Sequence, residues 1–227
     1  MTLKLGLMVP ANNTTMEPEM LAWMPGAVCT TLRIPRGPGL LGPEEIPAYV
    51  AQALELASSY DRANTDIVAY GCTAAGFIGG PAQDEDIQTE LARITGKPVV
   101  TTASAMIEVL RHIGARRVAV VTPYLDLVNA RLRAYLEQSG IVVAELASFN
   151  AATTDELAKI TPAQIAALAR ETMTPDADAM FIACSQLPTK DIMDDLAHEF
   201  GKPVWSSIKA TAWHAEQVLA GHDTVAA

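Results

Sequence analysis

Two apolar runs that end in the same way constrain the fold of this chain more than any other feature. DIVAYGCT at 66–73 has an acid in front, a cysteine after the apolar run and a hydroxyl residue behind it. DAMFIACS at 178–185 repeats this order, and its Cys184 lies 112 residues after Cys72. Short apolar runs that stop at a turn are typical of buried strands. We therefore predict two strands that end in equivalent turns, each carrying a thiol.

Two further pairs of phrases repeat in the same order along the chain. They are GLMVP (6–10) with AVVTP (119–123), and GKPVVTTASA (96–105) with GKPVWSSIKA (201–210). Repeats that share one order indicate an internal duplication with its divide near residue 114. We predict one half over residues 1–114 that carries Cys72 and a second over 115–227 that carries Cys184. We expect the final helix to pack back on the first half.

The remaining periodicity predicts an α/β fold. Short runs rich in Val, Ile and Leu predict strands over 3–9, 28–34, 66–70, 98–101, 117–122, 142–146, 179–183 and 203–205. Helical spacing and boundary residues predict helices over 44–60, 104–113, 125–138 and 162–173. Near-continuous apolar strands that alternate with helices are typical of a mostly parallel sheet covered on both faces. Because such sheets bind ligands beyond the carboxyl ends of their strands, we expect both thiols to face one cleft.

Composition limits the classes of partner. The 227-residue chain has 26 acids against 16 bases, and its net charge of −10 argues against binding to nucleic acid or an anionic membrane. It has no apolar run of the roughly 18 residues that a membrane span needs, and MTLKLGLMVP at its start lacks the features of a signal peptide. Three cysteines without paired spacing indicate a reducing compartment, so we expect a cytoplasmic protein.

The cysteines have an ordinary structural interpretation as well as a chemical one. A lone cysteine in an apolar run is usually an inert core residue, which is our interpretation of Cys29 in AVCTT. Cys72 and Cys184 differ because they form a pair at equivalent strand ends, followed by Thr73 and Ser185. Backbone N–H groups in a strand-to-helix turn can lower a thiol pKa, so this pair favours thiolate chemistry.

The loop PANNTTMEPE, which begins at Pro10, follows the first predicted strand. Asn13 or one of the two threonines after it can cap a helix whose first turn carries Glu17. The same amides and hydroxyls can also donate hydrogen bonds to an oxyanion. No acid precedes Glu17 in this loop.

Four further residues each have two interpretations. Tyr124 in TPYLD is either core packing or a phenol that donates to a carboxylate. Asn150 can occupy a turn, Tyr49 a helix core position and Lys209 an ordinary surface. Lys209 also follows closely after a predicted strand end, where a cation would favour a thiolate or a bound anion.

Motifs for metal or nucleotide binding are missing from the sequence. None of the four histidines has the spacing of a metal-ligand pair, and none lies beside a cysteine in sequence. The chain has no GxGxxG fingerprint, no P-loop and no nucleophile-elbow serine. We therefore expect neither a metal nor another cofactor.

PxxNTTMExE after the first strand, GCT and ACS at the paired strand ends, and TPY between them together resemble the aspartate/glutamate racemase superfamily. The similarity is greatest to its branch of maleate cis-trans isomerases and arylmalonate decarboxylases, and it spans nearly the whole chain. The resemblance implies two pseudo-symmetric flavodoxin-like halves, each a mostly parallel sheet flanked by helices, with the site in the cleft between them. It also implies a homodimer or a higher homo-oligomer.

The same resemblance assigns roles to residues. It implies that Cys72 is the nucleophile and that Cys184 handles a proton. It further implies that Asn13, Tyr124 and Asn150 hold the substrate carboxylates and that Thr73 lends its backbone N–H and hydroxyl. The remaining expected site residues are Ser185, Pro10, Tyr49 and Lys209.

Two departures favour isomerisation of a small dicarboxylate such as maleate. Amino-acid racemases of the superfamily usually carry an acid after the first strand, near the substrate ammonium, where this chain has Ala11-Asn12-Asn13. Decarboxylases lack the first cysteine, which is present here. The alternatives are a two-thiol racemase of a small acid or hydantoin-type substrate, an arylmalonate-type decarboxylase, and a non-catalytic module that binds small acids.

Overall fold

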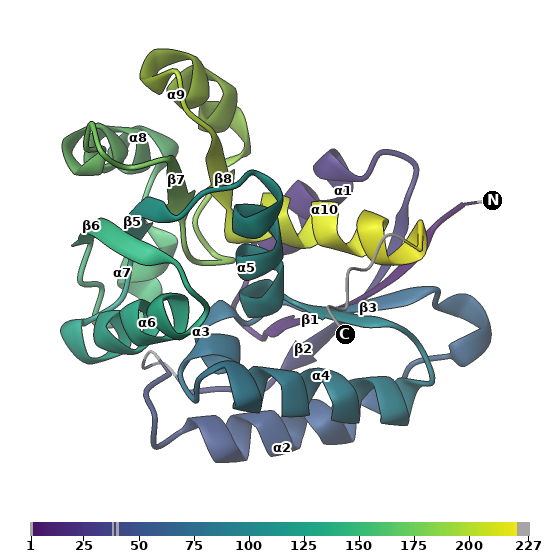
Figure 1. Ribbon diagram of the computed structural model, residues 1–227. Coiled ribbons are helices and arrows are strands. Elements are labelled where there is room, and N and C mark those ends of the chain that lie inside the picture. The colour runs from purple at the N-terminus through teal and green to yellow at the C-terminus, as the bar shows by residue number, and fades with distance from the viewer. Residues whose placement is uncertain (1, 38, 40, 222–227) are drawn as a thin grey trace.

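The structure, a computed structural model, describes residues 2–37, 39 and 41–221, in which the strands form two parallel sheets of four strands each (Figure 1). The first sheet has the order β2 (Val28–Ile34), β1 (Lys4–Pro10), β3 (Ile67–Tyr70) and β4 (Val99–Thr101). The second has the order β6 (Val142–Ser148), β5 (Arg117–Thr122), β7 (Ala179–Ile182) and β8 (Val204–Ser206). The two sheets therefore repeat one strand order.

The predicted α/β class with parallel sheets is confirmed, and each predicted strand is present to within two residues at either end. The reason is visible in the central strands β3 and β7, in which every residue is buried. A strand covered by helices on both faces has no polar face, so it appears in the sequence as an uninterrupted apolar run.

Ten α-helices lie in the described ranges. They are α1 (Met16–Trp23), α2 (Ile46–Ala57), α3 (Thr73–Phe77), α4 (Pro81–Thr95), α5 (Thr102–His112), α6 (Asp126–Gln138), α7 (Thr154–Ala158), α8 (Pro162–Thr172), α9 (Met193–Phe200) and α10 (Ser207–Leu219). Two short 3₁₀ helices, Arg62–Asn64 and Lys190–Ile192, lie between them. The four predicted helices correspond to α2, α5, α6 and α8, and Thr161 caps α8 as a capping box with Gln164.

Successive residues of β1 point to opposite faces of the first sheet. Leu5 and Leu7 belong to a core with α1 and α10, whereas Met8 packs in the core that includes α2 and α4. This alternation is the period of two expected for strand side chains. Figure 1 shows α1 and α10 on one side of this sheet and α2 and α4 on the other.

The repeated GKPV phrases form equivalent strand-to-helix junctions. The Thr101 hydroxyl accepts a hydrogen bond from the backbone N–H of Ser104 at 2.8 Å, and the Ser206 hydroxyl accepts one from the backbone N–H of Lys209 at 3.2 Å. The helices that follow, α5 and α10, pack against each other, and α10 also contacts α1 (Figure 1). The last described helix of the chain thus lies on the first sheet.

Polar contacts between residues far apart in sequence join the two sheets. The Glu19 carboxylate of α1 accepts backbone hydrogen bonds from Thr189 at 2.8 Å and from Lys190 at 3.2 Å. Burial raises the pKa of Glu19, and these donors oppose the rise. The boundary between residues 114 and 115, drawn from the sequence repeats, remains a prediction, and residues 222–227 lie outside the described part of the chain.

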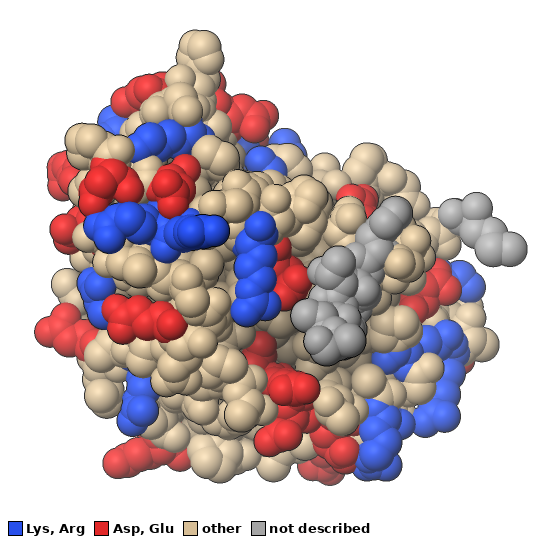
Figure 2. Space-filling model, in the orientation of Figure 1, with Lys and Arg blue, Asp and Glu red and all other residues tan. Residues whose placement is uncertain are grey.

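The surface carries charges of both signs. Figure 2 shows Lys and Arg side chains interspersed with Asp and Glu over the face in view. Within the described ranges, the search for a helix long and apolar enough to cross a membrane finds none.

Candidate active site

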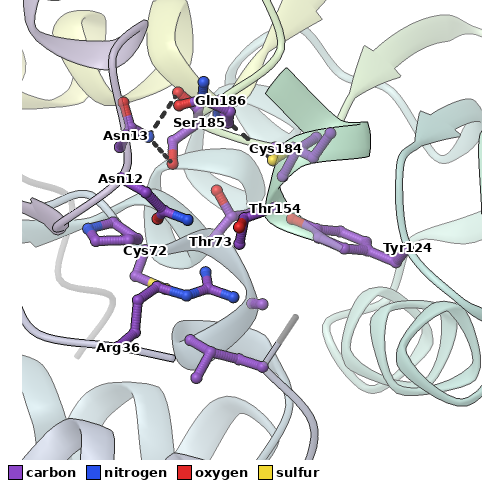
Figure 3. Close-up of a pocket in the computed structure, with 14 residues that line it drawn as sticks. Asn12, Asn13, Arg36, Cys72, Thr73, Tyr124, Thr154, Cys184, Ser185 and Gln186 are labelled. Carbon is purple, nitrogen blue, oxygen red and sulfur yellow. Dashed lines mark hydrogen bonds between the residues drawn. The ribbon is translucent and has the colours of Figure 1, made fainter. Parts of the chain in front are cut away.

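One cavity lies where the carboxyl ends of strands from both sheets meet (Figure 3). Its volume is about 40 Å³, about three times the space that one water molecule needs. The wall consists of Pro10, Asn12, Asn13, Cys72, Thr73 and Ala74 after strands of the first sheet, Tyr124, Cys184, Ser185 and Gln186 after strands of the second, and Arg36, Leu41, Thr154 and Leu157. The structure therefore brings both cysteine turns to a single cavity.

Cys72 lies between the end of β3 and the start of α3. The glycine before it is required for packing, because a Cβ atom at Gly71 would lie 2.5 Å from the Met16 sulfur and 2.9 Å from the Met8 carbonyl oxygen. Burial raises the pKa of the Cys72 thiol. The backbone N–H groups of Ala75 and Ala74, the Tyr49 hydroxyl and the charge of Arg36 oppose this rise. The thiol thus has several groups that stabilise its thiolate.

Cys184 follows β7 in the equivalent position of the second sheet. The backbone N–H of Gln186 donates to its sulfur at 3.4 Å. Burial raises the pKa of Cys184 to about 11, the Gln186 N–H and the Tyr124 hydroxyl oppose the rise, and a charge on Cys72 adds to it. Because each charge disfavours the other, ionisation of one sulfur keeps the other protonated, so a reactive pair consists of one thiolate and one thiol.

Asn13 connects the first loop to the second cysteine turn. Its side-chain oxygen accepts from the backbone N–H groups of Thr15 at 3.1 Å and Met16 at 2.9 Å. Of the three predicted caps, Thr15 is the N-cap residue of α1, and Asn13 holds the first N–H groups from just before it. Its amide nitrogen donates to the carbonyl and the hydroxyl of Ser185, at 3.1 and 3.2 Å. Asn13 is therefore largely engaged with the protein itself, although it borders the cavity.

The two hydroxyl residues behind the cysteines differ in their contacts. The Ser185 hydroxyl donates to the carbonyl of Gly71 at 2.7 Å and accepts from Asn13. It is therefore engaged with the protein both as a hydrogen-bond donor and as an acceptor. The buried Thr73 hydroxyl has no hydrogen-bond partner of standard geometry among the described residues. It borders the cavity and interacts with the Tyr124 hydroxyl, and it is therefore available to a ligand.

Tyr124 is buried at the side of the cavity toward Cys184. Its ring packs edge-on against Phe77 with ring centroids 5.6 Å apart, and this contact fixes its position. Its hydroxyl interacts with Cys184 and Thr73. The two predicted interpretations of Tyr124 are therefore compatible. Its ring packs in the core, and its hydroxyl is directed at the site.

Three predicted site residues do not line this cavity. Asn150 is exposed in a left-handed turn with φ of 51°, its amide donates to the Ser148 carbonyl, and it borders a separate surface hollow. Lys209 lies between the rings of Trp23 and Trp205, with its ammonium 4.9 and 4.8 Å from their centroids. Tyr49 contacts the Cys72 sulfur from α2 without lining the cavity. The turn, the cation–π contacts and the core position hold these side chains elsewhere.

Arg36 and Asn12 line the cavity although the sequence analysis does not select them. Figure 3 shows the Arg36 side chain passing beside Cys72 and the Asn12 amide directed toward the centre of the view. Arg36 is the only charged residue in the described wall. The only sequence signal for Arg36 is a base two residues after a predicted strand, in RIPRGPG.

Two segments close the cavity from opposite halves. Leu41 comes from the loop after β2, and Thr154 and Leu157 come from α7. The loop and the segment before α7 meet in an antiparallel bridge between Gly39 and Thr153. Backbone pairing thus joins the two segments that contribute Leu41, Thr154 and Leu157 to the cavity wall.

No group of three or more His, Cys, Asp and Glu side chains within the described ranges is arranged to hold a metal ion. One of the four histidines, His222, lies outside those ranges. The donors at the cavity are amides, hydroxyls, thiols and one guanidinium, and its wall contains no carboxylate among the residues described. Such a set suits a small anion.

Comparisons with known proteins agree with this geometry. A model of the arylmalonate decarboxylase (Amdase) family matches residues 5–227. The maleate isomerase of Nocardia farcinica is 31% identical over 219 residues, which cover 92% of this chain and 87% of that protein. The crystal structure of the maleate isomerase Iso from Pseudomonas putida S16 has a TM-score of 0.91 at 25% identity and covers 96% of this chain and 93% of that one.

A further solved structure is that of a cysteine-to-serine variant of the Nocardia farcinica maleate cis-trans isomerase with a covalently bound succinylcysteine intermediate. Its TM-score is 0.89 at 30% identity, and the match covers 96% of this chain and 93% of that one. Together these matches confirm the resemblance that the sequence motifs indicate.

Proposed function

This chain belongs to the arylmalonate decarboxylase family, and on that premise we propose that it is a cis-trans isomerase of a small enedioate such as maleate. The observation that carries the proposal is the position of Cys72 and Cys184, which line one cavity from equivalent turns of two sheets. The maleate isomerase relatives and the succinylcysteine found in one of them support the same assignment.

The first step breaks the double bond that prevents rotation. The Cys72 thiolate donates an electron pair to one alkene carbon and forms a sulfur–carbon bond. The two π electrons move to the neighbouring carbon and its carboxylate, which becomes an enediolate. Cys184 then transfers its thiol proton to that neighbouring carbon, so that a succinyl adduct on Cys72 and a Cys184 thiolate result.

The second step restores the double bond in the other geometry. The adduct rotates about its new carbon–carbon single bond. The Cys184 thiolate removes a proton from the carbon next to the sulfur-bearing one, the double bond reforms, and the sulfur–carbon bond breaks. The products are the trans acid, the Cys72 thiolate and the Cys184 thiol, so the reaction consumes no other reactant.

The enediolate needs hydrogen-bond donors that are already in place. The Tyr124 hydroxyl, the Thr73 hydroxyl and the backbone N–H groups after Cys72 are donors beside the two sulfurs. Donors that do not have to reorganise stabilise developing charge more than water does. We assign substrate binding to these groups, while Asn13 and Ser185 hold the cysteine turns together.

We further propose that the enzyme needs no cofactor, resides in the cytoplasm and forms a homodimer or a higher homo-oligomer. The missing nucleotide motifs and the three free cysteines support the first two properties. The resemblance to the superfamily is the argument for the third, and sedimentation velocity tests it. The repeated strand order supports the two halves, residues 1–114 and 115–227.

Decarboxylation of a malonate is the rival that family membership itself favours. Proton transfer from Cys184 could serve it, but that reaction has no use for the second thiol, Cys72, which lines the same cavity. Racemisation by the two thiols is the other rival. Proton NMR in deuterated water, with maleate, an aryl malonate and an amino acid, distinguishes all three. We expect conversion of maleate to fumarate; decarboxylation or α-proton exchange without that conversion would overturn the proposal.

A further inference from the structure

We propose that Arg36 makes the enzyme selective for doubly charged substrates, because its guanidinium receives the carboxylate attached to the carbon that Cys72 attacks. This inference rests on the proposed function of the same site. It extends that function because it names the residue that distinguishes a dianion from a monoanion.

The position of the guanidinium is the first argument. Arg36 follows β2, lines the cavity and lies beside Cys72 (Figure 3). The Tyr124 hydroxyl interacts with Cys184, and the Thr73 hydroxyl interacts with that of Tyr124. A substrate held between the sulfurs therefore has hydroxyl donors near one carboxylate and Arg36 near the other.

The unused hydrogen-bonding capacity of Arg36 is the second argument. One terminal nitrogen donates to the Gly39 carbonyl, which fixes the side chain against its own loop. The Nε atom is buried and has no hydrogen-bond partner among the described residues. A buried donor without a partner is unfavourable, and a carboxylate oxygen would satisfy it with a charge-assisted hydrogen bond.

Charge is the third argument. The chain has a net charge of −10, which repels a dianion at long range. Every other residue in the described wall of the cavity is neutral, so Arg36 supplies the only formal positive charge there. Neutral amides and hydroxyls could bind a monoanion, but the second carboxylate needs a cation to compensate its desolvation.

The two carboxylates have different parts in the chemistry. The one near the hydroxyls becomes the enediolate, so its donors act mainly in the transition state. The one at Arg36 keeps its charge throughout, so Arg36 binds the ground state and the transition state about equally. Loss of such an interaction appears mainly in KM.

The test compares maleate with its monoamide in the parent enzyme and in Arg36→Gln, Arg36→Lys and the control Arg93→Gln. Arg93 is exposed on α4 and pairs with Glu90, so the control removes the same charge far from the cavity wall. We expect Arg36→Gln to lower kcat/KM for maleate about 10- to 100-fold, as for one charge-assisted hydrogen bond. We expect a smaller loss for the monoamide, because for that substrate the variant removes only the charge that opposes the rise in the Cys72 pKa. Arg36→Lys should be intermediate, because an ammonium lacks the planar fork.

A binding readout that needs no turnover accompanies the kinetics. Iodoacetamide labels Cys72, which peptide mass spectrometry quantifies, and succinate or its monoamide is added as a protecting ligand. We expect Arg36→Gln to need at least about tenfold more succinate than the parent for the same protection of Cys72. The monoamide should protect Cys72 at the same concentration in the parent and in the variant.

The outcomes separate the two proposals. Equal losses for maleate and the monoamide in Arg36→Gln, or no loss, would overturn the role of Arg36 while leaving isomerisation intact. If the parent does not isomerise maleate but succinate protection still depends on Arg36, the proposed function fails and the dianion site stands. Thermal melting of each variant confirms that it is folded.

Discussion

The Ser185 hydroxyl donates a 2.7 Å hydrogen bond to the carbonyl of Gly71, which directly precedes Cys72. Ser185 itself directly follows Cys184, so this bond joins the two cysteine turns across the halves of the molecule. The Asn13 amide reinforces the link, because it donates to the same hydroxyl at 3.2 Å. The separation of the sulfurs therefore depends on a short chain of buried polar contacts as well as on the packing of the sheets.

Replacing Ser185 by alanine removes this link without changing either thiol. We expect about 1 kcal/mol lower stability, the usual net value of one hydrogen bond, and a roughly 10- to 100-fold lower kcat because the sulfurs lose their alignment. KM should change less than kcat, since the hydroxyl is not expected to contact the substrate. Steady-state kinetics and urea unfolding measure the two effects.

Ser139→Ala is the matched control for that variant. The Ser139 hydroxyl donates to the Tyr135 carbonyl at 2.9 Å at the end of α6, outside the cavity wall. We expect a similar small loss of stability with unchanged kinetics. A Ser185→Ala enzyme that keeps the parent kcat would show that the link does not position the sulfurs.

The two cysteines should give different phenotypes when each is changed to serine. Cys72→Ser should lose more than about 10³-fold in kcat, because a serine hydroxyl is hardly ionised at neutral pH and none of the described groups that interact with Cys72 is a base. Cys184→Ser should keep the nucleophile and accumulate an adduct on Cys72. The serine hydroxyl or water can protonate the basic enediolate carbon, but the variant lacks the thiolate needed for elimination. Intact-protein mass spectrometry after incubation with maleate reports a gain of one maleic acid. Adduct formation at Cys184 in the Cys72→Ser enzyme would reverse the assignment.

Tyr49 tests the stabilisation of the thiolate from the side of α2. Its hydroxyl lowers the pKa of Cys72, and it has no hydrogen-bond partner of standard geometry in the described part of the chain. We expect Tyr49→Phe to lower kcat/KM several-fold at pH 7 and much less at pH 9.5, with unfolding free energy unchanged or higher. The gain in stability would follow from removal of an unsatisfied buried hydroxyl.

Tyr60→Phe is the control for Tyr49, because the Tyr60 hydroxyl is also buried without a hydrogen-bond partner of standard geometry among the residues described, and its ring packs beside Gly6 of β1. It should leave the pH dependence of activity unchanged. An identical loss at pH 7 and pH 9.5 in Tyr49→Phe would mean that the phenol acts on something other than the thiol.

The strands and the cysteine pair could be predicted because both depend on local sequence. A buried parallel strand is an apolar run whatever surrounds it, and the two turns repeat each other's residues. Helix α4 was harder to predict, because its first turns are rich in acids and amides and only Ile87 and Leu91 are buried among its apolar residues. It begins directly after Gly80, which has a positive φ, and the glycines of GFIGGP made this segment look like a loop in the sequence.

Arg36 could not be predicted because its role depends on tertiary arrangement. Its strand, β2, is not adjacent to β3, which carries Cys72, so only the strand order and the course of the next loop bring them together. Lys209 had a better local signal, but Trp23, from the other half, holds its ammonium in a cation–π contact. The spacing of residues along the sequence predicts neither the contact of Arg36 with the cavity nor the contact of Lys209 with Trp23.

The rate should depend on pH through both thiols. Burial raises the pKa of Cys72, so the thiolate is a minor species at pH 7 and kcat/KM should rise about tenfold per unit while pH stays below that pKa. Activity should fall again as pH approaches about 11, where Cys184 loses its proton. A kcat/KM profile from pH 6 to 10.5 measures this. A flat profile between pH 6 and 8 would show that the thiolate already exists at neutral pH in the free enzyme.

Asp84 makes stability depend on pH through a buried carboxyl that joins the halves. Its Oδ2 atom accepts from the Thr101 hydroxyl at 2.9 Å and from the Tyr135 hydroxyl of α6 at 3.0 Å. Burial raises its pKa to about 7, against about 3.9 in an unfolded chain. The native state therefore binds more protons between these values. The stability contribution of the carboxyl is full below pH 4 and is lost as pH rises through 7, by about 1.4 kcal/mol per unit within the window.

Asp84→Asn keeps the shape and an accepting oxygen but cannot ionise, so it should remove this dependence. We expect the variant to gain stability relative to the parent as pH rises from 5 to 7, with the difference levelling off above pH 8. Urea unfolding at pH 5, 6, 7 and 8 measures the difference, with Asp86→Asn, an exposed position on the same helix, as the control. If the parent and Asp84→Asn curves run parallel over this range, the carboxyl is charged in the native state throughout, and the Thr101 and Tyr135 hydroxyls bind an anion rather than a neutral acid.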